Sequence, residues 1–124
     1  MQINASRNSG FTLLEIMIVV AIIGLLAGIS TPSALRARES GQLNSILSNL
    51  RMIENSKDQW ALDNKTGAGA QPLDAEIAQY IKGYKMPSPV VGETYYVNPI
   101  GTNASAIIPV SLGSIGAGGS VTLP

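Results

Sequence analysis

The most chemically unusual residue in the sequence is Glu15, because its carboxylate lies near the start of an otherwise apolar run over residues 11–29. An ionised carboxylate in hydrocarbon is costly, so an acid at such a position indicates a function and requires a partner. The chemistry open to this side chain is the pairing of its charge with a cation. Which cation reaches it depends on the elements that hold Glu15.

The rest of the composition removes most other chemistry. The chain of 124 residues contains no His and no Cys, which excludes the commonest general base, the commonest zinc ligand and any disulfide. Eight Lys and Arg balance eight Asp and Glu, so no polybasic surface indicates a nucleic acid as the main partner. We therefore expect a protein that is not an enzyme, with no catalytic residues and no cofactor.

The apolar run that carries Glu15 is long enough to cross a membrane. At 1.5 Å per residue, residues 11–34 cover roughly the 30 Å of a hydrocarbon core. Residues 1–10 are short and polar, and Arg7 would stay on the cytoplasmic side. A secretory signal peptide has its cleavage site after the apolar stretch, whereas the candidate processing point, Gly10, lies before it. A plain signal anchor is the simpler alternative, but it leaves Glu15 unexplained.

The six residues 10–15, Gly-Phe-Thr-Leu-Leu-Glu, resemble the processing motif of type IV prepilins and type II secretion pseudopilins. Those families have a short polar leader that ends in Gly, then Phe, then Glu four residues later and an apolar run. Pro32 also lies where they usually carry a proline, and the resemblance covers about residues 7–38. It implies that a membrane-embedded prepilin peptidase cuts between Gly10 and Phe11 and methylates the new amine of Phe11.

The same resemblance supplies a cation for Glu15. Cleavage would create a charged amine at Phe11, and in such filaments the carboxylate is thought to pair with the N-terminal amine of an adjacent subunit. Two charges in a low-dielectric environment are tolerable only when they are paired and hydrogen-bonded. Before assembly we expect the charge of Glu15 to be unpaired and therefore energetically costly. After assembly, the pair of Glu15 and the Phe11 amine would fix the axial register of the subunits.

Small residues and a proline weaken the apolar helix. Gly24 and Gly28 form a pair that allows another helix to approach closely, and Pro32 lacks an amide hydrogen and clashes with the preceding turn. Ser30 and Thr31 can bond to nearby backbone carbonyls instead. We expect a kink or a locally melted stretch between Gly24 and Pro32, more marked in a filament than in the free subunit. A gentle bend without function is the alternative.

Beyond Pro32 the pattern predicts the amphipathic half of one long helix that runs from Phe11 to about Leu62. Glu54, Lys57 and Asp58 are expected on a solvated or inter-subunit face. The apolar stripe comprises Leu35, Leu43, Ile46, Leu47, Leu50, Ile53 and Trp60, and Trp60 is expected in the core.

The remaining residues predict a short helix and a small antiparallel sheet packed on the long helix. The helix is expected over residues 72–83, with Leu73, Ile77, Tyr80 and Ile81 on its buried face. Strands are expected over 94–98, 106–110 and 120–123. Pro109 favours an edge strand. Tyr95 and Tyr96 would face opposite sides of the sheet, one of them toward the core.

These observations together predict an α+β, pilin-like fold. Residues 1–10 would be a cleaved leader, residues 11–34 the transmembrane and assembly helix, and residues 35–124 a small globular domain that includes the amphipathic half of the helix. Many pilins close a C-terminal loop with two cysteines, so here we expect packing alone to hold such a loop. Major pseudopilins commonly bind calcium through C-terminal acids, but no Asp or Glu follows Glu93, so we expect no metal site.

The first functional hypothesis is a structural subunit of a type IV pilus or a pilus-like extracellular filament. The alternative is a major-type pseudopilin of a type II secretion system, and a minor pilin that binds DNA or a surface is less favoured. The implied partners are other copies in a helical filament, prepilin peptidase and an inner-membrane assembly platform. The chain would cross the bacterial inner membrane once before assembly and lie in an extracellular pilus or a periplasmic pseudopilus afterwards.

Overall fold

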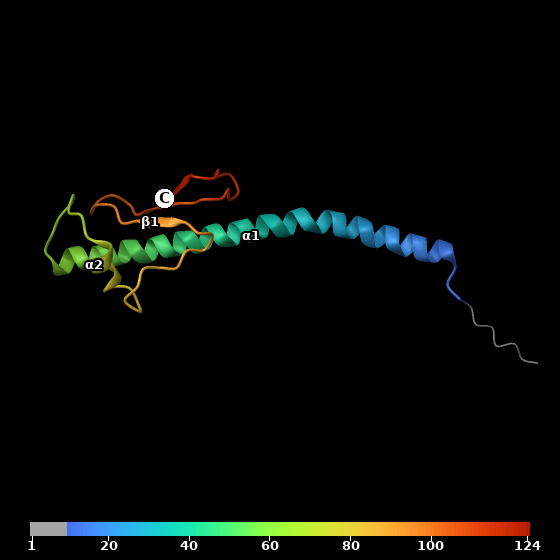
Figure 1. The fold of residues 1–124 in the computed structure, drawn as a ribbon, viewed down its shortest axis with the longest axis horizontal. Coiled ribbons are helices and arrows are strands. Elements are labelled where there is room, and N and C mark those ends of the chain that lie inside the picture. Colours follow the sequence, from blue (N-terminus) through green and yellow to red (C-terminus); the bar gives the residue numbers. More distant parts are fainter. Residues whose placement is uncertain (1–9) are drawn as a thin grey trace, which may run out of the picture. The chain divides into compact units, whose positions relative to one another are not determined.

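The computed structural model describes residues 10–124, which divide into a unit that ends at Leu35 and a unit over Arg36–Pro124. Along the chain the elements follow in the order α1, α2, β1, β2, β3, and Figure 1 labels the first three of them. One long N-terminal helix and a small antiparallel sheet confirm the predicted α+β, pilin-like class. The predicted leader lies outside the described residues, except for Gly10. The elements are α1 over Leu13–Asp63, α2 over Asp74–Ala78, β1 over Thr94–Tyr96, β2 over Ser105–Ile107 and β3 over Ser120–Thr122.

The second half of α1 supplies the apolar stripe around which the second unit packs. Steps of three and four residues bring Ile46, Leu50 and Ile53 to one side of the helix, where all three are fully buried. Trp60 continues this side and is also buried, which confirms its place in the core. Leu35, predicted as the first residue of the stripe, is exposed, so the stripe begins later than predicted.

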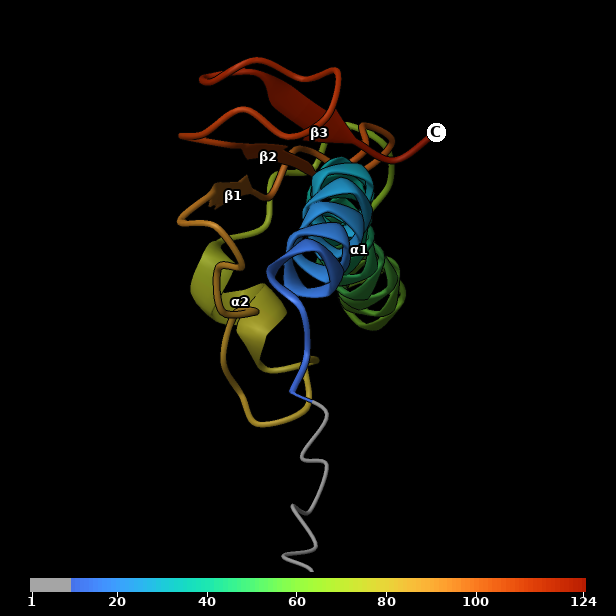
Figure 2. The ribbon, with the colours of Figure 1, turned by 90° about the vertical axis from the view of Figure 1, so that its right-hand side faces the viewer.

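The three strands pair antiparallel, as the sequence predicts, and the structure shows their order to be β1-β2-β3 (Figure 2). One cross-strand row consists of Tyr95, Ala106 and Val121, and it packs in the core formed with α1. Ala106 and Val121 are buried and Tyr95 is half-buried, whereas Tyr96 is exposed. The two tyrosines therefore face opposite sides of the sheet, as predicted.

The strand that approaches Pro109 is central in the sheet and not at its edge. β2 has a neighbour on each side and ends at Ile107, two residues before the proline. Because proline has no amide hydrogen to donate to a neighbouring strand, the strand stops short of it. The predicted edge position is therefore wrong, and β2 is shorter than the predicted strand over residues 106–110.

Hydrogen bonds hold the C-terminal segment that returns to the sheet as β3. The Ile108 amide donates to the Gly119 carbonyl at 3.1 Å, and the Asn103 side-chain amide donates to the Leu123 carbonyl at 3.2 Å. A Cβ on Gly119 would lie 2.6 Å from Cγ2 of Ile115, which leaves room only for glycine. The prediction that packing alone holds this loop is therefore wrong.

α2 is shorter than the helix predicted over residues 72–83, because it ends at Ala78. The following amides bond to carbonyls three residues back, as in the 3.0 Å bond from Tyr80 to Ile77, so the chain continues as tighter turns. Ile77 is fully buried as predicted. Leu73 lies before the first helical turn and is exposed, which corrects its predicted burial.

Candidate functional site

Glu15 caps the N-terminus of α1. The Thr12 amide donates a hydrogen bond to Glu15 Oε2 at 2.8 Å, and the Glu15 amide donates one to Thr12 Oγ1 at 3.2 Å. This reciprocal pair is a capping box, which satisfies two of the amides that a helix leaves free in its first turn. The positive end of the helix dipole also favours a carboxylate at this position.

The capping box refines the prediction that Glu15 is unpaired before assembly, because its charge has no cation within residues 10–124 but one oxygen accepts a hydrogen bond. Its carboxylate is not without a partner in the single chain, because Oε2 accepts the Thr12 amide. Within residues 10–124, Oε1 accepts no hydrogen bond and no cation lies within 4.0 Å of the carboxylate, so one oxygen remains open to a further donor. The signal in the sequence is the spacing Thr-x-x-Glu in front of an apolar run, which predicts a capping box.

Gly10 and Phe11 precede the helix and form an accessible segment. Both residues are exposed and lie outside α1, which begins at Leu13. No atom of another element lies within 4 Å of the position that a Cβ on Gly10 would take. A cut between Gly10 and Phe11 would leave the capping box in the product, because Thr12 and Glu15 both follow that bond.

α1 is unbroken through Gly24, Gly28 and Pro32 in the single chain. The hydroxyls of Ser30 and Thr31 each donate at 2.9 Å to the backbone carbonyl four residues earlier, which confirms the predicted bonding next to the proline. A kink or a locally melted stretch was predicted here, more marked in a filament than in the free subunit. The single chain shows no melted stretch, and for the filament the prediction stays untested.

The apolar side chains of the first unit are exposed from one end of the unit to the other. α1 contains an 18-residue window with a mean hydropathy of 2.6 in which no residue is buried. By length and composition, it is the one helix in the described part of the chain that can cross a membrane. An exposed apolar surface of this extent requires a lipid or protein environment.

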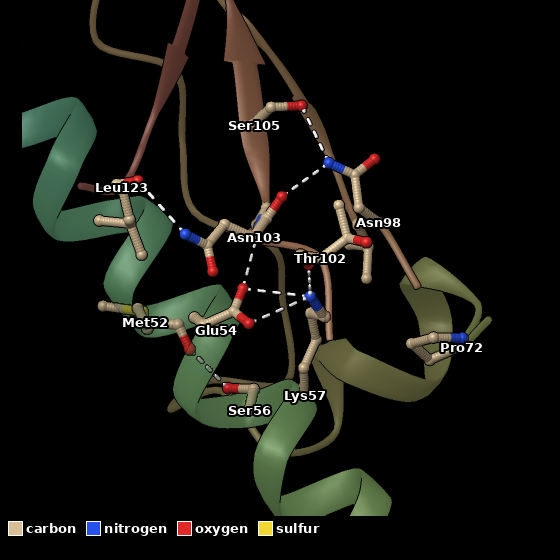
Figure 3. Close-up of polar contacts among 12 residues, drawn as sticks. Met52, Glu54, Ser56, Lys57, Pro72, Asn98, Thr102, Asn103, Ser105 and Leu123 are labelled. Atoms are coloured by element: carbon tan, nitrogen blue, oxygen red, sulfur yellow. Dashed lines mark hydrogen bonds and ion pairs between the residues drawn. The ribbon is translucent and has the colours of Figure 1, made fainter. Parts of the chain in front are cut away.

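The second unit contains a buried charge network, which joins α1 to the loop before β2 (Figure 3). The ammonium of Lys57 donates to both oxygens of Glu54 at 3.1 and 3.2 Å and to the Thr102 carbonyl at 2.6 Å. The Glu54 carboxylate also accepts the Ala104 amide at 2.9 Å. The four groups satisfy one another and fasten the loop to the helix.

Lys57 is fully buried, so its predicted place on a solvated or inter-subunit face is wrong. The helical spacing carries the signal that the prediction missed. Lys57 follows Ile53 by four residues and precedes Trp60 by three, which places it on the buried side of α1. The carboxylate of Glu54 and a backbone carbonyl then make burial of the charge possible.

A buried acid, Glu93, ties the segment before β1 to α1. Its carboxylate accepts hydrogen bonds from the Val90 amide at 2.8 and 2.9 Å, from the Val91 amide at 2.8 Å and from the Tyr95 hydroxyl. The Asn49 side chain on α1 donates to the Tyr95 hydroxyl at 2.8 Å. Glu93 is therefore a structural anchor.

The same hydrogen bonds set the protonation of this pair. Burial alone would raise the pKa of Glu93, but the hydrogen bonds from Tyr95, Val91 and Val90 hold that pKa below its ordinary value. Burial, together with the hydrogen bond to Glu93, raises the pKa of Tyr95. Within residues 10–124, no group of three or more Asp, Glu, His or Cys side chains is placed to hold a metal ion.

Comparison with known proteins shows which family the chain resembles. Residues 5–31 match the family model described as the prokaryotic N-terminal methylation motif. The type II secretion system core protein G of Escherichia coli (strain K12) is 40% identical over 107 residues, which cover 75% of this chain and 74% of that protein. The protein of the same name from Vibrio cholerae serotype O1 is 31% identical over 106 residues, which cover 75% and 73%.

Other relatives match over a shorter part. The type II secretion system core protein G of Aeromonas hydrophila is 40% identical over 72 residues, which cover 57% of this chain. The chain spans about half the length of that relative and of its Klebsiella pneumoniae counterpart, at 50% and 51%. No solved structure matches the chain.

Proposed function

Because the chain belongs to the pilin and pseudopilin family, we propose that it is a major-type pseudopilin of a type II secretion system. The observation that carries this proposal is the 40% identity to the Escherichia coli type II secretion system core protein G over three-quarters of both chains. The relatives favour this alternative over our first hypothesis, an extracellular type IV pilus. The chain would act as a structural subunit and not as an enzyme.

Processing at Gly10–Phe11 would give the mature subunit. Hydrolysis of that peptide bond leaves a carboxylate on Gly10 and a free amine on Phe11, and methylation of this amine keeps it basic. The exposed, non-helical position of both residues supports access by a prepilin peptidase. The mature chain would remain in the inner membrane through the apolar half of α1.

Assembly would then use the open oxygen of Glu15. Oε2 would keep its hydrogen bond from the Thr12 amide of its own chain. Oε1 would accept a hydrogen bond from the Phe11 amine of an adjacent copy. Because the capping box already orients the carboxylate, the incoming amine meets a fixed acceptor. Moving the apolar helix from lipid into a filament of like helices keeps its surface out of water, and Gly24 and Gly28 would allow the close approach.

The experiment that tests the proposal is deletion of the gene in its source bacterium, with secretion and twitching motility measured in the same strain. A pseudopilin predicts that secreted enzymes accumulate in the periplasm while motility is unchanged. Normal secretion together with lost motility would contradict the proposal and restore the pilus hypothesis. Complementation with the wild-type gene is the control.

A further inference from the structure

A cleft in the second unit includes Arg36, the first residue of that unit. It has a volume of about 280 Å³ and lies between α1 and the loop that precedes β3. The helical residues that line it are spaced by three and four, so they share one face of α1. The lining residues are Arg36, Glu39, Ser40, Leu43, Gly113 and Ser114.

The cleft offers one cation and one anion to a ligand. Arg36 is exposed and Glu39 is half-buried. In the described part of the chain, the one ion pair within 4.0 Å joins Lys57 and Glu54, so Arg36 and Glu39 do not pair with each other. The hydroxyl groups of Ser40 and Ser114 add donors and acceptors. A complementary ligand carries an anionic group and a cationic donor a short distance apart.

We propose that this cleft binds the headgroup of a phospholipid that contains phosphoethanolamine. The phosphate would pair with the guanidinium of Arg36, which matches phosphate geometry with two parallel N–H donors. The ammonium, with three N–H donors, would pair with the carboxylate of Glu39. The inference rests on the membrane anchoring proposed above, because Arg36 comes two residues after the end of the proposed spanning segment and so lies at headgroup depth.

The chemistry of the cleft separates three common headgroups. Phosphocholine carries a quaternary ammonium with no N–H to donate to Glu39. Phosphoglycerol carries no cation at all, so it leaves Glu39 without a partner next to a second anion. Phosphoethanolamine is the headgroup that satisfies both charged side chains.

Arg38 provides a matched control on the same turn of α1. It has the same charge as Arg36 and is exposed, but it lies about 200° further around the helix and does not line the cleft. A general attraction of positive charge to the membrane surface would depend on both arginines alike. A headgroup cleft depends on Arg36.

The test is native mass spectrometry of the full chain in micelles that contain equal amounts of phosphatidylethanolamine, phosphatidylglycerol and phosphatidylcholine with the same acyl chains. The wild type should retain about tenfold more phosphatidylethanolamine than phosphatidylcholine, as the gain of a charge-assisted hydrogen bond predicts. Arg36→Gln should reduce that retention about tenfold, and Glu39→Gln should remove the preference over phosphatidylcholine. Arg38→Gln should stay within about twofold of the wild type.

Equal retention of the three lipids, or equal losses in Arg36→Gln and Arg38→Gln, would overturn the headgroup site. Circular dichroism of each variant should show unchanged helix content, because the substituted side chains are exposed or half-buried. Carbonate extraction of membranes separates the two proposals. Release of the chain would overturn the anchoring and the headgroup site with it, whereas a retained chain without lipid preference would overturn the headgroup site alone.

Discussion

In the assembly that we propose, Glu15 would divide its two oxygens between a partner in its own chain and an amine of an adjacent copy. The Thr12 amide occupies Oε2, and Oε1 is open within the described residues. The capping box helps to explain how an acid can lie at the start of an apolar helix before assembly. The cap offsets part of the cost of the charge, and the neighbouring amine of the proposed filament offsets the remainder.

The substitution Glu15→Gln should separate the two roles of the carboxylate. The carbonyl of the new side-chain amide still accepts the Thr12 amide, but it no longer attracts a charged amine, so we expect unchanged processing and about tenfold fewer filaments. The measurement is the amount of chain in sheared filaments relative to the amount in membranes. Thr12→Ala, which removes only one bond of the cap, should reduce the yield less; equal losses in both variants would contradict the charge pairing.

Glu93 should make stability sensitive to acid. Its pKa is lower in the folded chain than in the unfolded chain, so its contribution is complete above its ordinary pKa of about 4.3 and is lost as the pH falls through the folded value. We expect a flat free energy of unfolding from pH 7 to about 5 and a decrease below about 4.3. Urea unfolding in detergent, followed by the fluorescence of Trp60, measures this.

Glu93→Gln provides the control for that pH profile. The variant should be less stable at pH 7, because an amide accepts fewer and weaker hydrogen bonds than a carboxylate, and its stability should decrease less in acid. Parallel pH profiles for the wild type and the variant would show that Glu93 does not cause the acid dependence.

At the scale of elements, α1 and the loop before β2 are held together by Lys57 and Glu54. Sequence reasoning placed these charges on the surface because it assigned charged residues to polar faces. The spacing of Lys57 from Ile53 and Trp60 indicated the opposite, and the carbonyl that completes its bonding, on Thr102, is 45 residues away in the chain. No local pattern reveals such a partner, which is why the burial was missed.

Lys57→Met should destabilise the second unit by about 2–3 kcal/mol, because it leaves Glu54 without its cation and the Thr102 carbonyl without a donor. The free energy of urea unfolding in detergent, measured through Trp60, gives this value. Adding Glu54→Gln to the variant should recover part of the loss, since the remaining charge is removed. A Lys57→Met chain as stable as the wild type would show that the network does not hold the loop.

At the scale of the whole molecule, periodic sequence patterns predicted which helices and strands form. They predicted less well where each helix or strand ends and which segments it packs against. The fold class, the long helix, the antiparallel sheet and the opposite faces of Tyr95 and Tyr96 followed from spacing and turn residues. The end of α2 and the central place of β2 depend on contacts between distant segments, so sequence patterns did not predict them. The capping box was readable from Thr12 and Glu15 alone, but it was missed because only a distant cation was considered as a partner for Glu15.

The most direct test of the proposed assembly is electron microscopy of filaments formed by the processed chain, at a resolution that shows side chains. The proposal predicts Glu15 Oε1 within about 4 Å of the Phe11 amine of an adjacent copy, with Oε2 still on its own Thr12 amide. A filament in which the Phe11 amine lies away from every Glu15 carboxylate would contradict the account.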